Sequence, residues 1–389
     1  MAEQVLFQNA RVYSPTSVIE PGWLLVEGRS IAAFGSDSPP AAVLAGSPQV
    51  IEAQGLDLLP GFIDMHVHGA LGYDVIDAST EGLQAIARYL AQHGVTSFLA
   101  ATWTAPDEEI SRALAAVRKV YGQISSGATL VGAYLEGPYL NPNRAGAQAY
   151  GQIRSAAERA PAQGFIADEM VRVVVIAPEI PENLWMIEEC TRNGITVSAG
   201  HTAATYEEMQ VAVARGVRHL THCFNAMGAL HHRQPGVVGA GLTMPELRCE
   251  LIADNIHVHP AAQQILFQAK GPYGMLLVSD SIRATGLPDG EYDYDLRKVI
   301  VKGDSVRLAD GTLAGSLLSM DQALKNFAKN VRRPLSEIWP VVSLTPARAI
   351  GIAHQKGVLE AGHDADLVLL DAEFNVQLTM AEGRIVYQK

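Results

Sequence analysis

Two histidines separated by one residue, His66 and His68, are the first candidates for chemistry in this chain. They follow residues 61–65, a mostly apolar segment that predicts a short buried strand with both histidines at its C-terminal end. Residues i and i+2 of a strand point to the same side, so both imidazoles can face one point, as a divalent transition metal requires. The alternative is a polar pair at a strand end, and the dyad alone does not decide between the two.

Four further side chains that bind metals or carry protons follow other apolar segments. They are Glu136 after 129–135, His201 after 195–200, His222 at the end of 217–222, and Asp280 after 274–279. Each has a structural explanation by itself: a solvated turn residue, a helix cap, a core histidine or a loop anchor. Their shared place at the ends of apolar segments favours a metal site.

The elements that must position these side chains alternate along the middle of the chain. Eight apolar segments predict buried strands at 61–65, 95–101, 129–135, 171–177, 195–200, 217–222, 247–253 and 274–279. Helical patterns lie between them at 81–92, 107–121 and 206–215, the last opened by a capping box from Thr205 to Glu208 and ended by Gly216. This order predicts an α/β fold with a (β/α)8 TIM-like barrel, in which functional residues lie at the C-terminal ends of the strands.

The flanking regions differ from this middle. Ser319 and Thr345-Pro346 signal two later helices, each as a cap residue. Short strand patterns fill 4–59 and resume in 357–389, which predicts a small β-sandwich built from both termini. We therefore expect a small domain of 1–59 plus 352–389 and a barrel domain of 60–351.

The candidate residues predict metal-assisted hydrolysis of a carbon–nitrogen or ester bond. Glu136, His201 and His222 would make a compact first site with room for water, and His66 and His68, with Asp280 or Glu136 bridging, would add a second. A bound ion brings the pKa of water towards neutrality, and Asp280 suits the base that takes its proton and returns it to a leaving group. The fourth strand has no lysine to bridge two metals, so Glu136 is the substitute bridge.

Other polar residues after the strands could hold a substrate. Asn225 and Arg233 follow the sixth strand, and His257 follows the seventh. Arginine and histidine on adjacent loops would suit a phosphate group. The alternative for Arg233 is a surface salt bridge, which the spacing does not exclude.

The composition limits the classes of partner. The formal net charge is −12, with 48% hydrophobic and 18% charged residues, which is typical of a globular protein and argues against nucleic acid. No apolar run is long enough to span a membrane and no secretory signal opens the chain. Three widely spaced cysteines predict reduced thiols in a cytoplasmic protein.

Several motifs together resemble the N-acetylglucosamine-6-phosphate deacetylases of the amidohydrolase superfamily, over nearly the whole chain. The motifs are Pro-Gly-Phe-Ile-Asp-Met-His-Val-His-Gly (60–69), Leu-Glu-Gly-Pro-Tyr-Leu-Asn-Pro (135–142), Gly-His-Thr-Ala-Ala (200–204), Thr-His-Cys-Phe-Asn-Ala-Met (221–227), His-His-Arg-Gln-Pro-Gly (231–236), Ile-Ala-Asp-Asn-Ile-His-Val (252–258), Val-Ser-Asp-Ser-Ile-Arg-Ala-Thr-Gly-Leu-Pro-Asp-Gly-Glu-Tyr (278–292) and Leu-Ala-Gly-Ser (313–316).

This resemblance implies specific roles. Glu136, His201 and His222 would bind the principal metal, usually zinc, with iron, manganese or cobalt as alternatives, and His66 with His68 would bind a second. Asp280 would be the catalytic base and acid. The sugar phosphate would meet Asn225, the backbone of Ala226, Arg233, His257 and Leu313. A homodimer is expected, in which a neighbouring subunit contributes to the phosphate site.

Two departures from the family pattern affect this expectation. Gln148 stands where many members have a histidine that polarises the acetyl carbonyl, and its amide can donate a hydrogen bond without carrying charge. Gln234 replaces a glutamate beside Arg233.

We expect deacetylation of N-acetyl-D-glucosamine 6-phosphate. The alternatives are the same reaction on N-acetylgalactosamine 6-phosphate, a cyclic-amide hydrolase, and a catalytically silent protein that binds metal or sugar phosphate.

Overall fold

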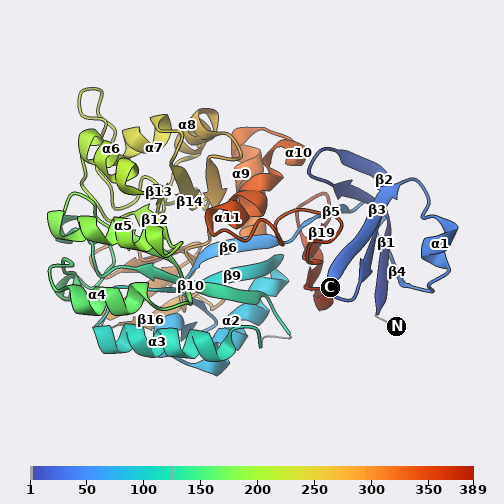
Figure 1. The fold of residues 1–389 in the computed structure, drawn as a ribbon, viewed down its shortest axis with the longest axis horizontal. Helices are drawn as coiled ribbons and strands as arrows, with labels where there is room; N and C mark the ends of the chain where they lie inside the picture. Colours follow the sequence, from blue (N-terminus) through green and yellow to red (C-terminus); the bar gives the residue numbers. More distant parts are fainter. Residues whose placement is uncertain (1–2, 124–125, 296) are drawn as a thin grey trace.

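The computed structural model describes residues 3–123, 126–295 and 297–389. Two bodies lie side by side along its longest axis: a barrel surrounded by helices, and a smaller sheet that contains both ends of the chain (Figure 1). The arrangement confirms the predicted fold class. Among the described residues, no helix combines the length and apolarity that crossing a membrane requires.

Eight parallel strands form the barrel sheet, and they follow one another in chain order from β6 to β15. Every residue of β9 and β10 is buried, because helices cover the outer face and side chains fill the inside. All eight strands were predicted, with ends that differ by up to two residues. The strands are β6 Phe62–Val67, β9 Val95–Thr102, β10 Thr129–Glu136, β11 Val171–Ile176, β12 Thr196–Ala199, β13 Val217–Leu220, β14 Arg248–Leu251 and β15 Met275–Leu277.

The first and eighth strands approach each other through the residues that follow β15. Val67 and Ser281 form an isolated parallel bridge, and the backbone N–H of Asp280 donates to the carbonyl oxygen of His66 at 3.0 Å. This contact brings the segment that carries Asp280 against the histidine dyad.

Helices pack around the sheet in the order that a barrel requires. The predicted capping box of α6 is present, since the side chain of Thr205 accepts from the backbone of Glu208 and the Glu208 carboxylate accepts from Thr205. The helices are α2 Thr80–Gln92, α3 Asp107–Val120, α4 Arg159–Ile166, α5 Leu184–Arg192, α6 Tyr206–Arg215, α7 Gly236–Thr243, α8 Pro260–Lys270, α9 Met320–Val331, α10 Leu335–Ile338 and α11 Leu344–Ala349.

The two later helices were predicted with different success. Helix α9 begins directly after Ser319, as expected. The cap predicted at Thr345 is wrong, because α11 begins at Leu344 and Thr345 lies inside its first turn. The hydroxyl of Thr345 donates instead to the carbonyl of Pro272 at 2.7 Å, a tertiary contact that the local sequence does not reveal.

The second sheet joins strands from both ends of the chain, as predicted. Its order is β21-β20-β19-β5-β1-β2-β3, with β4 paired to β1, and the antiparallel pair of β5 with β19 links the N-terminal and C-terminal parts. A core of its own includes Phe7, Leu24, Leu367 and Met380. The elements are β1 Gln4–Tyr13, β2 Val18–Glu27, β3 Ser30–Ser36, α1 Ala41–Leu44, β4 Gln49–Glu52, β5 Asp57–Pro60, β19 Leu367–Leu370, β20 Val376–Ala381 and β21 Arg384–Gln388.

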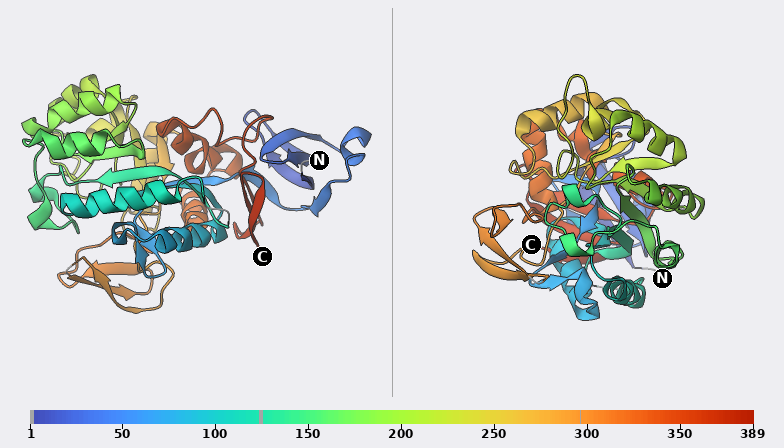
Figure 2. Two further views of the ribbon diagram at one scale, coloured as in Figure 1. Left: turned by 60° about the horizontal axis from the view of Figure 1, so that its bottom comes forward. Right: turned by 90° about the vertical axis from the view of Figure 1, so that its left-hand side faces the viewer.

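One antiparallel sheet was not predicted. Strands β16 Gly290–Tyr294, β17 Arg297–Lys302 and β18 Ser305–Leu308 form a three-stranded sheet after β15, seen at the lower left of Figure 2. A small hairpin of β7 Gly69–Ala70 and β8 Tyr73–Asp74 follows β6. Because β16 ends beside the open end of the barrel, Tyr294 and the segment after β18 reach the cavity described below.

Candidate metal centre

A cavity of about 200 Å³ lies at the C-terminal ends of the barrel strands. It is lined by most of the residues that the sequence singled out: His68, Glu136, Gln148, His201, His222, Asn225, Ala226, His257, Asp280 and Leu313. His66 lies just beneath this lining and is fully buried. The side chains therefore come from strands far apart in the sequence and meet at one end of the barrel.

The first group of ligand atoms consists of Glu136, His201 and His222. Glu136 Oε1 lies 3.0 Å from His201 Nε2 and 2.9 Å from His222 Nε2, and the two nitrogens are 3.1 Å apart. Each residue comes from the end of its own strand, so the group depends on the barrel as a whole. All three side chains are buried.

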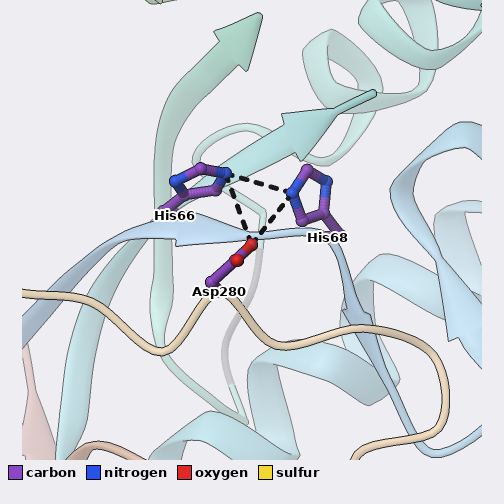
Figure 3. Close-up of side chains that lie close together, drawn as sticks. All are labelled: His66, His68 and Asp280. Atoms are coloured by element: carbon purple, nitrogen blue, oxygen red, sulfur yellow. Dashed lines mark hydrogen bonds and ion pairs between the residues drawn. The ribbon is translucent and has the colours of Figure 1, made fainter. Parts of the chain in front are cut away.

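The second group consists of His66, His68 and Asp280, whose side chains point toward one another in Figure 3. The two Nε2 atoms are 3.0 Å apart, and Asp280 Oδ1 lies 3.6 Å from His66 Nε2 and 3.3 Å from His68 Nε2. His66 lies in β6, His68 directly follows that strand, and Asp280 comes from the segment after β15. The i, i+2 spacing of the histidines and the backbone hydrogen bond from Asp280 to His66 together bring these three side chains to one point.

Glu136 faces both groups. Its Oε1 contacts His201 and His222, while its Oε2 lies 3.3 Å from His68 Nε2 and 3.7 Å from His66 Nε2. One carboxylate with one oxygen toward each group is suited to bridge two ions. The role of Glu136 as a bridge between two ions stays a prediction from the sequence.

These side chains fit a divalent metal. Ligands about 2.0–2.1 Å from a tetrahedral ion are spaced about 3.3 Å from one another, close to the donor spacings in both groups. His201 Nδ1 lies 2.9 Å from the carbonyl oxygen of Arg144, which leaves Nε2 free to bind an ion. Within the described part of the chain, the Nδ1 atoms of His68 and His222 have no hydrogen-bond partner.

The charges around the cavity also favour the binding of a cation. Burial raises the pKa of Glu136, but His66, His201 and His222 outweigh it, so the net pKa is well below the ordinary value. Burial likewise opposes the charged form of His68, yet hydrogen bonds to Asp280 and Glu136 raise its pKa to about 9. The carboxylates therefore remain ionised and attract cations into the cavity.

Gln148 is held in a fixed orientation. Its Oε1 accepts from the backbone N–H of Thr104 at 2.8 Å, and its Nε2 donates to Glu136 Oε2 at 2.6 Å. One of its two amide hydrogens is thus used on Glu136 in this structure. From the sequence, this amide is expected only as a donor to an oxyanion.

Some of the residues expected to bind substrate line the cavity, and Arg233 does not. His257 lines the cavity, with Nδ1 2.6 Å from Asp254 Oδ2, and Asn225 donates to the carbonyl oxygen of His222 at 3.3 Å. Arg233 is exposed and lies outside the set of described residues that line the cavity. Its Nη1 is 2.7 Å from His232 Nε2.

Sequence reasoning missed residues that support or complete the site. Glu250 lies in the middle of β14, fully buried, and its carboxylate contacts His66 Nδ1 at 3.1 Å. A charged residue inside an apolar strand is the signal that could have found it. Tyr294 and Thr312 line the cavity from the three-stranded sheet and the segment after it, and neither residue was singled out from the sequence.

Comparisons with known proteins agree with this geometry. The model of the amidohydrolase family matches residues 58–386. An N-acetylglucosamine-6-phosphate deacetylase of Vibrio furnissii is 41% identical, over 85% of this chain and 83% of that protein. An N-acetylgalactosamine-6-phosphate deacetylase of Escherichia coli O157:H7 is 38% identical, over 94% and 96%. The solved structure of an N-acetyl-D-glucosamine-6-phosphate deacetylase variant from Mycobacterium smegmatis, in complex with N-acetyl-D-glucosamine 6-phosphate, superposes with a TM-score of 0.90 at 30% identity, covering 99% of this chain and 100% of that one.

Proposed function

This chain belongs to the amidohydrolase family, and we propose that it removes the acetyl group from N-acetyl-D-glucosamine 6-phosphate to give D-glucosamine 6-phosphate and acetate. The observation that carries the proposal is the pair of ligand groups that share Glu136 at the end of the barrel, with Asp280 beside them. The relatives that act on phosphorylated N-acetylhexosamines support the choice of substrate.

Two sets of side chains would hold metal ions. Glu136, His201 and His222 would bind the principal ion, and His66, His68 and Asp280 a second. A bound divalent ion supplies Lewis acidity toward a carbonyl oxygen and toward water. We propose zinc, because three nitrogen and oxygen ligands with an open fourth position are typical of catalytic zinc sites.

Asp280 is the proposed proton carrier. It lines the cavity, and burial raises its pKa, but His66 and His68 lower the pKa by more, so the net pKa lies below its ordinary value. Its carboxylate is therefore ionised and can accept a proton from attacking water. The same proton then passes to the nitrogen of the departing amine, which leaves as the carbon–nitrogen bond breaks.

The remaining lining residues would hold the sugar phosphate. His257 has its Nδ1 occupied by Asp254, which leaves Nε2 to face a phosphate oxygen, and Asn225, Ala226 and Leu313 line the same cavity. Gln148 would hold Glu136 and donate its second amide hydrogen toward the developing oxyanion.

The exposed position of Arg233 bears on the assembly. An arginine outside its own cavity could serve as a phosphate ligand by reaching the cavity of another subunit, and we propose a homodimer in which it does so. A cytoplasmic location is proposed as well, since all three cysteines are unpaired and buried.

The test is acetate release by metal-loaded protein from four sugars: the phosphorylated and unphosphorylated forms of N-acetylglucosamine and N-acetylgalactosamine. We expect turnover of the phosphorylated gluco sugar, and a fall of about 10²–10⁴-fold in kcat for Asp280→Asn. No turnover of any sugar, with ligand binding unchanged in Asp280→Asn, would leave only a silent binding protein. Equal turnover of unphosphorylated sugars would refute the phosphate site.

The galacto epimer is the second candidate, because the relative that acts on N-acetylgalactosamine 6-phosphate is nearly as similar as the one that acts on the gluco sugar. The ratio of kcat/KM for the two phosphorylated sugars decides between them.

A further inference from the structure

Glu250 is a buried carboxylate that touches both ligand groups without belonging to either. Its Oε2 lies 3.1 Å from His66 Nδ1 and accepts from the backbone N–H of His222 at 3.1 Å. Its Oε1 accepts from the hydroxyl of Tyr134 at 3.0 Å and lies 3.2 Å from His219 Nε2. Four donors thus surround a side chain with no exposed surface.

We infer that Glu250 is a positioning residue that fixes the ring of His66 for binding an ion. An ionised carboxylate only accepts hydrogen bonds, so the nitrogen of His66 that faces it must carry a hydrogen. A neutral imidazole with its hydrogen on Nδ1 has its lone pair on Nε2. That Nε2 is the atom that points toward His68 and Asp280 in Figure 3.

The packing around His66 leaves the ring little freedom to choose another orientation. The ring of Tyr134 stacks on it with centroids 4.3 Å apart and an interplanar angle of 26°. Both side chains have essentially no exposed surface. A flipped ring would place a carbon atom against the Glu250 carboxylate, a buried charge that would lose one of its donors.

Glu250 also reaches the first group through the backbone. The N–H of His222 donates to its side chain, and the N–H of Cys223 donates to its main-chain carbonyl at 2.8 Å. His222 has a φ of 31°, outside the region that non-glycine residues prefer, so its backbone needs such anchors. One residue on β14 therefore supports the bend that turns the imidazole of His222 into the cavity.

Buried carboxylates that hold metal-binding histidines typically change metal affinity by about 10- to 100-fold when removed. We expect Glu250→Leu to weaken the binding of Zn²⁺ to the His66 group by about this factor. Glu250→Gln should retain most of the affinity, because its amide oxygen can face His66 and His222 while its nitrogen faces Tyr134 and His219.

The matched control is Ser198→Ala. Ser198 Oγ lies 2.6 Å from Thr221 Oγ1, which in turn lies 2.9 Å from the Tyr134 hydroxyl, so the control removes a side chain from the same buried polar network without touching Glu250. It should leave the affinity for Zn²⁺ unchanged. Thermal unfolding of all variants, measured in parallel, separates a general loss of stability from a change in the metal site.

The second readout needs no metal. In metal-free protein with ¹⁵N-labelled histidine, long-range ¹⁵N–¹H spectra report which ring nitrogen of His66 carries the hydrogen, with His66→Asn identifying the signals. Burial lowers the pKa of His66, but Asp280 and Glu136 outweigh it and raise the pKa well above its ordinary value, so the spectra are followed to the pH at which the ring is neutral. We expect a hydrogen on Nδ1 in the wild type and in Glu250→Gln, and a mixture in Glu250→Leu. This measurement on the wild type decides the inference even where Glu250→Leu does not fold.

The inference rests on the proposed function in one respect, the binding of an ion by the His66 group. Wild-type protein that binds a single Zn²⁺ would overturn both proposals for that group. Two bound ions in the wild type, with unchanged affinity in Glu250→Leu or with the hydrogen of His66 on Nε2, would overturn the role of Glu250 alone.

Discussion

One buried lysine, Lys356, lies at the centre of an ion-pair cluster that also joins the two ends of the chain. Lys356 Nζ lies 2.8 Å from Asp366 Oδ2, 2.9 Å from Asp364 Oδ2 and 3.3 Å from Glu382 Oε1, and only 5% of its side chain is exposed. Arg29, in the N-terminal part of the sheet, pairs with Asp364 and Glu382. We predict that Lys356→Met destabilises the protein strongly while leaving the metal centre intact.

The magnitude follows from the balance of charges. Lys356, Arg29 and Arg384 match the three carboxylates, Arg384 at 3.6 Å from Glu382. Removing the lysine leaves one negative charge without a partner, and Asp366 is the most buried of the acids. Methionine keeps the packing of the stem, so the loss is electrostatic. Breaking a buried ion pair from one side costs about 3–5 kcal/mol, and we expect the free energy of unfolding to fall by that amount at pH 7.

The assay is urea unfolding, monitored by circular dichroism, of wild type, Lys356→Met, Asp366→Asn and the double variant. Replacing Asp366 removes the unpaired charge, so the double variant should recover much of the loss. Burial already raises the pKa of Asp366, and losing the lysine raises it further, so the deficit is full at pH 7 and shrinks as the pH falls. A loss below about 1 kcal/mol, as for an exposed pair, would refute the reasoning. So would a deficit that does not shrink in acid.

Three further predictions concern the cavity and its surroundings. His66→Ala should lower the metal content from two ions to one per chain, measured by elemental analysis. Gln148→Leu leaves the N–H of Thr104 without an acceptor and removes one donor from Glu136 Oε2, which still faces His68, so the free energy of unfolding of metal-free protein should fall by about 1–3 kcal/mol. Burial raises the pKa of Asp74 from 3.8 to about 6, so its ionisation costs stability progressively as the pH rises between these two values and by a constant amount above them. Between pH 4 and pH 7 the stability of Asp74→Asn should therefore rise relative to wild type by about 2–3 kcal/mol, measured from unfolding midpoints.

The barrel and its ligand groups could be predicted because each depends on a local pattern. Continuous apolar segments identify strands buried on both faces, and parallel strands of a barrel present their C-terminal ends on one side. That rule alone brings Glu136, His201 and His222 together. The bond between Asp280 and His66 needed no separate prediction, because it follows when the first and eighth strands of the barrel meet.

Other features depend on contacts between distant segments. Thr345 looked like a helix cap, but its hydroxyl donates to the carbonyl of Pro272, 73 residues away. Glu250 resembles any charged residue in a short strand until its neighbours on other strands are known. The sheet of β16–β18 is half exposed, and buried and exposed residues alternate along its strands, so it lacks the continuous burial of the barrel strands.

The backbone is strained at three of the residues that would bind metal. His201, His222 and Asp280 have φ values of 46°, 31° and 51°, in the left-handed region, and each lies two or three residues after the end of a barrel strand. This conformation costs about 1–2 kcal/mol for a residue with a β-carbon, and glycine would remove the cost. Glycine would also remove the ligand. The three residues therefore make the metal-free protein less stable than its fold allows, and ions that bind only the folded state offset the deficit by mass action. Metal binding and folding are thus linked through the same three turns.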